Sequence, residues 1–180
     1  MSLKIVSHIV LLCLFSAHTL FAQPVATMEK EVDLAIQNFN YKIEGGEKFL
    51  SKVKGYAVFP LVTQGGLILG GKYGKGAMRV EGKTKFYLKM TSASVGLQAG
   101  VQRYSMLIAF ITEASLKKFY KSSGWQTGIE SAITVAQWGA NRDIGFDNFD
   151  QPVVAFIFNE EGIMAGVSMR GTKFERIIPQ

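Results

Sequence analysis

Residues 56–90, YAVFPLVTQGGLILGGKYGKGAMRVEGKTKFYLKM, decide how this chain folds, because β-branched and aromatic runs alternate there with glycines. Such a pattern is typical of short strands separated by turns. It predicts strands at 56–62, 66–73, 77–81 and 85–90.

The segments that follow continue the β pattern and interrupt it once. Residues 92–111 are β-rich, and Gly96 and Gly100 predict bends or close backbone approach. A short helix is expected at 113–121, with Thr112 as its N-cap. Further strands are expected at 131–138, 153–159 and 163–170, the last two joined by a hairpin turn at Glu160-Glu161-Gly162.

The segment before Tyr56 has helical periodicity instead. Between residues 28 and 41 apolar side chains recur at helical spacing, with Thr27 as the expected N-cap and Glu29 and Glu31 in the first turn. Residues 47–54 predict a short second helix. The polar face of the first helix is acidic, which favours packing on the core over a place in a membrane interface.

Strands that follow one another without long helices between them favour an antiparallel sheet over a doubly wound parallel one. The predicted fold class is α+β, a single domain with a mainly antiparallel β-sheet, an N-terminal amphipathic helix and a short helix near 113–121. The expected organisation is a signal peptide at 1–22, an N-terminal helical segment at 23–55, and the β-rich portion of the same domain at 56–180.

The N-terminus has the layout of a secretory signal peptide. Lys4 is its only charge, an apolar run follows, and small residues precede Gln23. The run is shorter than the roughly 20 apolar residues that span a bilayer. We therefore expect cleavage after Ala22 and an exported, periplasmic or envelope-associated protein. Leu12, directly before Cys13, argues against processing as a lipoprotein.

Cys13, the only cysteine, and both histidines, His8 and His18, lie in the segment expected to be removed. The mature chain would then lack the residues from which most nucleophile–base pairs and zinc sites are built. A binding module that is not an enzyme, and that needs no cofactor, is the expectation.

Two motifs that suggest ligands fail at decisive positions. Residues 66–72 nearly spell a phosphate-binding loop, but Tyr73 stands where the Ser or Thr for magnesium is needed. Asp143, Asp147 and Asp150 share one loop and are candidate calcium ligands, although their spacing does not fit an EF-hand. A solvated acidic turn is the favoured interpretation of that loop.

Positive charge gathers in the middle of the chain, whose formal net charge is +6. Residues 72–89 contain six cations and only Glu81 as an acid. If strand alternation and a tight turn bring them together, Lys72, Lys75, Lys83 and Lys85 form a candidate site for lipid phosphates. The alternative is a solvated row of lysines that keeps the sheet edge from pairing with other chains.

Four blocks in the sequence resemble those of the SYLF family, in the family's order. They are KGYAVFP at 54–60, LGGKYGKG at 69–76, SASVGLQAGVQ at 92–102 and EGIMAGVSMRG at 161–171. The resemblance implies a lipid-binding domain, since eukaryotic SYLF proteins bind phosphoinositides and include yeast actin-binding proteins. It implies no reaction, and it identifies no residues for a headgroup site.

Taken together, the sequence predicts a lipid-binding module of the cell envelope that contacts anionic phospholipid through its basic strands. An envelope scaffold that binds a protein partner without any lipid is the alternative. Nucleic acid is not an expected partner, because export separates the protein from it.

Overall fold

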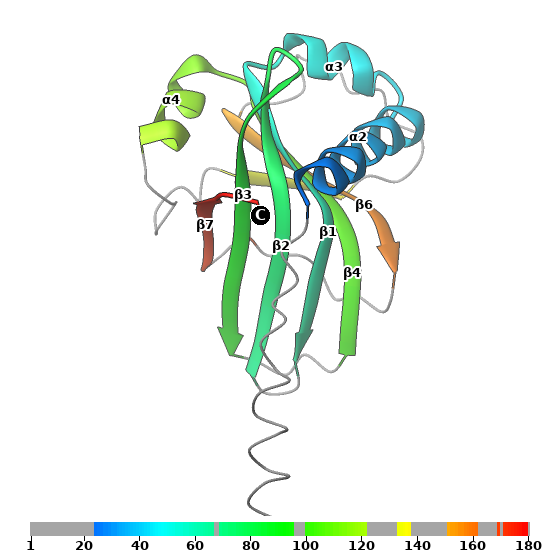
Figure 1. The fold of residues 1–180 in the computed structure, drawn as a ribbon, viewed down its shortest axis with the longest axis vertical. Helices are drawn as coiled ribbons and strands as arrows, with labels where there is room; N and C mark the ends of the chain where they lie inside the picture. The colour runs from blue at the N-terminus through cyan, green and yellow to red at the C-terminus, as the bar shows by residue number, and fades with distance from the viewer. Residues whose placement is uncertain are drawn as a thin grey trace, which may run out of the picture.

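The computed structural model describes residues 24–66, 69–95, 100–121, 133–137, 151–161, 169 and 171–179. In chain order, its elements are α2 (Val25–Lys42), α3 (Gly46–Lys52), β1 (Gly55–Gly66), β2 (Leu69–Val80), β3 (Lys83–Val95), β4 (Gly100–Phe110), α4 (Glu113–Lys121), β5 (Ile133–Gln137), β6 (Val153–Glu161) and β7 (Thr172–Ile177). Within these ranges one seven-stranded sheet has the order β5-β6-β4-β1-β2-β3-β7 (Figure 1). Among the described strands only β5 and β6 pair in parallel, so the predicted α+β fold with a mainly antiparallel sheet is confirmed.

Helix α2 packs on one face of the sheet through the apolar stripe that its sequence predicts. Its buried side chains are Met28, Val32, Ala35 and Phe39. The Phe39 ring meets the Phe156 ring of β6 edge-on, with 5.3 Å between centroids. We call this side of the sheet the α2-side face.

The start of α2 differs from the prediction. The helix begins after Pro24, whose carbonyl accepts hydrogen bonds from the N–H groups of Thr27 and Met28 at 3.0 and 3.1 Å. Thr27 is therefore inside the helix and is not its N-cap, and Glu29 and Glu31 lie beyond the first turn. Proline presets the backbone for helix entry and has no N–H to leave unsatisfied, so the helix starts earlier than the apolar stripe indicates.

Arg79 of β2 fixes α2 to the sheet. Its Nη2 donates to Glu29 Oε2 and to Asp33 Oδ1, both at 2.7 Å, and its Nη1 donates to the Gly82 carbonyl at 3.0 Å. The Tyr87 hydroxyl donates to the other Glu29 oxygen at 2.6 Å. One cation of the basic segment is therefore structural, and the acidic face of α2 serves packing.

Glu29 should make stability depend on pH in the acid range. Burial alone would raise the pKa of Glu29, but the hydrogen bond from Tyr87 and the charge of Arg79 outweigh it and lower the pKa below 4.5. A carboxyl whose pKa is lower in the folded than in the unfolded state stabilises the fold at pH values above its unfolded-state pKa. This contribution is lost as the pH falls through the folded-state pKa. Urea titrations should show wild type more stable than Glu29→Gln at pH 7, with the difference shrinking below about pH 4.5. A difference that stays constant down to pH 3 would contradict this assignment.

The opposite side, which we call the α4-side face, carries the second part of the core. Helix α4 places Phe119 against Phe110 and Phe174, with centroids 4.8 and 6.2 Å apart. The predicted cap is confirmed, because the Ser115 N–H donates to Thr112 Oγ1 at 3.2 Å. Among the described helices, none is both long and apolar enough to cross a bilayer.

Several predicted strand limits are wrong. The strands expected at 66–73 and 77–81 are one continuous strand, β2. Glu160 and Glu161 still belong to β6 and do not form the expected turn. The strand expected at 163–170 lies almost wholly outside the described residues, and β7, which pairs with β3, follows it.

Candidate functional site

The four predicted lysines occupy different settings. Lys72 and Lys75 both lie on β2, three positions apart, so strand alternation directs them to opposite faces. Lys72 is on the α4-side face and only 8% exposed. Lys83 and Lys85 are exposed at the start of β3, directly after the turn at Glu81 and Gly82.

The sheet does not bring these lysines together. Lys75 is the cross-strand partner of Lys89, whereas Lys83 pairs with Val80 beside the turn. Lys83 and Lys89 are six positions apart on β3, which is about 20 Å of strand. The register also shifts beside Lys85, which has no partner in the β2 ladder. The expectation that a tight turn gathers all four is therefore not met.

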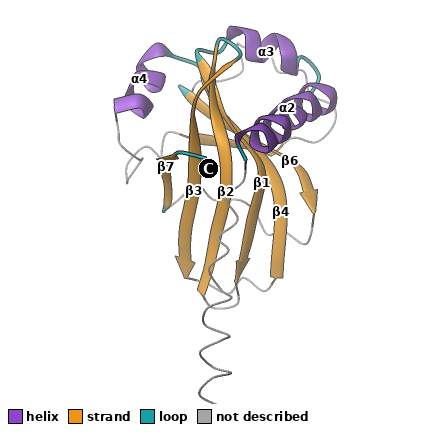
Figure 2. Cartoon of the chain, viewed as in Figure 1, coloured by secondary structure: helices purple, strands orange, loops and turns teal. Residues whose placement is uncertain are grey.

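The α2-side face is covered by α2 only in its upper part, as Figure 2 shows, and the strands continue below the helix. In that lower part three apolar side chains are exposed, Leu61 by 54%, Tyr73 by 47% and Val101 by 63%. Such a group of exposed apolar side chains on a sheet is typical of an interaction surface.

Two cations lie among these apolar side chains. Lys75 is the cross-strand partner of Leu61, and Arg103 pairs with Thr63, which pairs in turn with Tyr73. We call this set the open sheet face. It consists of Leu61, Thr63, Tyr73, Lys75, Val101 and Arg103.

A β-bulge explains why Leu61 points outward. The register of β1 shifts between Val58 and Leu61 against β2. The Ser105 hydroxyl donates to the Pro60 carbonyl at 2.7 Å and accepts from Asn159 Nδ2 at 3.1 Å, which holds the irregular segment. The extra residue places Val62 in the core and leaves Leu61 on the open sheet face. Nothing in the sequence pattern predicts the position of this bulge, other than Pro60 within the strand.

The edge of the open sheet face toward β7 carries paired charges. Lys89 and Lys173 donate to the two oxygens of Glu175 at 2.8 and 2.7 Å. Their hydrogen bonds lower the pKa of Glu175 to about 2. One carboxylate is thus shared by two ammonium groups, so this edge adds positive charge to the face.

A hollow of about 420 Å³ borders the face on the side of β6. Leu61 and Arg103 contribute to it from the open sheet face, and Lys42 from the end of α2. Glu160 and Glu161 line the opposite side. The hollow extends the amphiphilic surface past the bulge.

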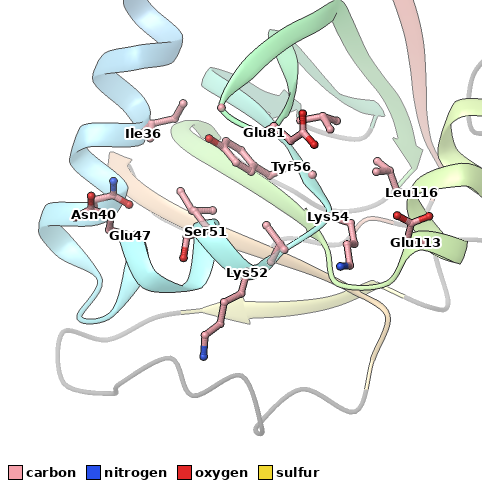
Figure 3. Close-up of a pocket in the computed structure, with 15 residues that line it drawn as sticks. Ile36, Asn40, Glu47, Ser51, Lys52, Lys54, Tyr56, Glu81, Glu113 and Leu116 are labelled. Atoms are coloured by element: carbon pink, nitrogen blue, oxygen red, sulfur yellow. The ribbon is translucent and has the colours of Figure 1, made fainter.

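A second hollow, of about 640 Å³, lies at the other end of the sheet between α2, α3 and α4 (Figure 3). Its lining mixes Lys54 with Glu47, Glu81 and Glu113. Glu113 pairs with Lys117 at 2.9 Å, and this hydrogen bond lowers the pKa of Glu113. A general acid needs a raised pKa, so Glu113 is a poor candidate for that role.

Two other motifs of the sequence are the phosphate-loop-like segment at 66–72 and the acidic loop with Asp143, Asp147 and Asp150. Strand β2 runs through the phosphate-loop-like segment, so Lys72 sits within a strand and does not precede a helix. Asp143, Asp147 and Asp150 lie outside the described residues. In the ranges that are described, no three His, Cys, Asp or Glu side chains are grouped to hold a metal ion.

Comparison with known protein families relates the second half of the chain to one of them. Residues 91–176 match a protein family described as "Ysc84: Las17-binding protein actin regulator". This range begins in β3 and ends in β7, so it includes β4, α4 and β6 but not the four predicted lysines. No curated protein matches the chain.

Proposed function

We propose that this chain is a non-enzymatic lipid-binding module of the cell envelope, because residues 91–176 match the Ysc84 family and its sequence blocks resemble those of SYLF proteins. The family is related to lipid binding and actin regulation. The finer claim, contact with anionic phospholipid, is supported by one observation. The open sheet face places Lys75 and Arg103 among exposed apolar side chains.

This combination suits the surface of an anionic bilayer. Each cation near such a surface contributes about 1 kcal/mol of attraction. Transfer of the exposed Leu61, Tyr73 and Val101 side chains from water into the headgroup boundary further stabilises the bound state. A tyrosine is well suited to that boundary, because its ring is apolar and its hydroxyl stays hydrated.

The signal-like N-terminal sequence supports the proposed envelope location. An exported protein meets phospholipid headgroups at membrane surfaces, and the net positive charge of the chain favours anionic ones. Of the four lysines predicted from the sequence, Lys75 is the one that contacts the membrane in this proposal. Lys83 and Lys85 are exposed elsewhere, beside the turn between β2 and β3.

Vesicle co-sedimentation tests the proposal, with phosphatidylcholine vesicles that contain a rising fraction of phosphatidylglycerol. We expect binding to rise with the anionic fraction and to weaken at high salt. Lys75→Glu combined with Arg103→Glu should weaken binding at least about 30-fold, since each reversal removes one attraction and adds one repulsion.

The matched control is Lys83→Glu combined with Lys85→Glu, which changes the net charge equally at the turn between β2 and β3. It should retain most of the binding. Equal loss in both pairs would show that net charge alone governs binding, and no binding to any vesicle would refute the function.

A protein-interaction module without a lipid ligand is the second candidate, favoured by the family description, which names a protein partner. For that role, a pull-down from envelope extract should recover one stoichiometric protein with no co-purified phospholipid. Phospholipid in the purified complex would decide against it.

A further inference from the structure

The hollow of about 640 Å³ between α2, α3 and α4, which we call the α3 hollow, has the size of a small-molecule site. Its walls contain five half-buried apolar side chains: Ile36, Leu50, Val53, Val80 and Leu116. Each of them packs against one of the two core clusters of the protein and keeps part of its surface free. The α3 hollow therefore has apolar walls against which the body of a ligand can pack.

One buried hydrogen-bond acceptor in this lining lacks a donor. Asn40 reaches the α3 hollow from α2, and its Oδ1 is buried without a hydrogen-bond partner in the part of the chain that the structure describes. Buried polar groups nearly always have such a partner. The unpaired oxygen therefore indicates a ligand that donates a hydrogen bond.

Tyr56 of β1 brings a second polar atom to the α3 hollow. The residue is 8% exposed, and its hydroxyl makes no hydrogen bond with the described residues. Burial raises the pKa of Tyr56, so the hydroxyl is protonated and uncharged at neutral pH. Its oxygen still has lone pairs that can accept a hydrogen bond from a ligand.

Carboxylates decide the sign of charge that the α3 hollow favours. Figure 3 shows Lys54 and Glu113 on the side of α4, where Glu113 has its ion pair within α4 and the charge of Lys54 also acts on it. Lys52 makes another interaction within the chain. Glu47 and Glu81 also line the hollow, and neither forms a salt bridge with a described residue. Two carboxylates are thus left to attract a cation.

We propose that the α3 hollow binds a small organic ammonium ion with an apolar body. An ammonium group donates up to three hydrogen bonds and accepts none. Asn40 Oδ1, the Tyr56 hydroxyl oxygen and the Glu81 carboxylate supply acceptors for it. The same carboxylates repel a phosphodiester, and the hollow lies at the other end of the sheet from the open sheet face. The proposal therefore does not depend on lipid binding.

NMR titration of the isotope-labelled protein tests the site with three probes that share a phenyl ring. These are phenethylamine, a cation at neutral pH, uncharged phenethyl alcohol, and anionic phenylpropionate. Phenethylamine should bind at least about tenfold more tightly than the alcohol, because its hydrogen bonds are charge-assisted. Phenylpropionate should bind most weakly. Amide shifts caused by the amine should concentrate at residues 53–56 and 80–82.

Asn40→Leu gives a signature that a purely structural role would not produce. The variant has a similar volume and removes the unpaired oxygen, so its thermal midpoint should stay or rise while its affinity for phenethylamine falls at least about tenfold. Glu81→Gln should weaken the amine about threefold or more. The matched control is Glu44→Gln, in the turn between α2 and α3 and outside the lining, which should keep the wild-type affinity.

Three results would overturn the proposal. The first is that phenethyl alcohol binds as tightly as the amine, and the second is that wild type binds none of the three probes. The third is that Asn40→Leu and Glu81→Gln both keep the wild-type affinity for the amine. If the Lys75→Glu, Arg103→Glu pair loses vesicle binding but still binds the amine normally, the α3 hollow is supported as a separate site.

Discussion

Replacing Gly76 with alanine is expected to lower the free energy of unfolding by about 3 kcal/mol or more. A Cβ at this position would lie 2.0 Å from the Val58 carbonyl oxygen and 2.9 Å from Phe59 Cδ1. Both neighbours belong to β1, and the closer one is backbone, so no rotamer change relieves the overlap. The strands themselves would have to separate at the edge of the bulge that exposes Leu61.

Urea unfolding followed by circular dichroism measures this effect. Gly71→Ala is the matched control on the same strand, because its Cβ would meet only the Ser92 carbonyl, at 3.1 Å. We expect that variant to stay within about 1 kcal/mol of wild type. Equal stability of the two variants would contradict the close approach of β1 and β2 at Gly76.

Replacing Arg79 with methionine is expected to destabilise the protein by about 3 kcal/mol, because it leaves the partly buried Glu29 carboxylate without its cation. Asp33 is half-exposed and contributes less to this cost. The loss should be largest in α2, whose contact with β2 depends on the guanidinium. Hydrogen exchange should accordingly show faster exchange in α2 than in β4.

Two further variants isolate the ion pair. Lys85→Met removes a neighbouring cation that is exposed, and it should change stability by less than about 0.5 kcal/mol. Adding Glu29→Gln to Arg79→Met should recover part of the loss, because the uncompensated charge is removed. If the double variant is as unstable as the sum of the single ones, the pair is not coupled and the account of α2 docking is wrong.

Local signals in the sequence were sufficient to predict that α2 and α4 exist. The apolar stripe from Met28 to Phe39 and the cap at Thr112 both predict elements that the structure contains. The start of α2 could not be placed, since the proline at 24 begins the helix before the stripe does. Periodicity reports which side chains are buried and says less about where the backbone turns.

Long-range pairing limited the prediction of the sheet. Gly74 and Gly76 look like breaks in a strand, but both lie within β2, where an added Cβ would crowd the backbone of β1. The parallel pairing of β5 with β6 and the pairing of β7 with β3 join segments far apart in the chain. No local pattern encodes such partners.

The candidate site was predicted in part. The sequence indicates several cations on neighbouring strands, and the structure places them on β2 and β3 without bringing Lys72, Lys75, Lys83 and Lys85 together. The sequence does not show that Arg79 forms an ion pair with Glu29 or that Lys72 is buried. The exposed apolar partners, Leu61 and Val101, depend on the bulge and on strand register, which composition cannot supply.

The central claim is that the open sheet face contacts the bilayer, and a fluorophore placed on it measures this directly. Cys13 is the only cysteine, so Cys13→Ser provides a background in which single cysteines can be labelled with an environment-sensitive dye. Tyr73→Cys reports on the open sheet face, and Tyr41→Cys reports on an exposed position of α2. On addition of phosphatidylglycerol vesicles, the account predicts a blue-shifted, brighter signal at position 73 and little change at position 41. A shift at position 41 with none at position 73 would contradict it.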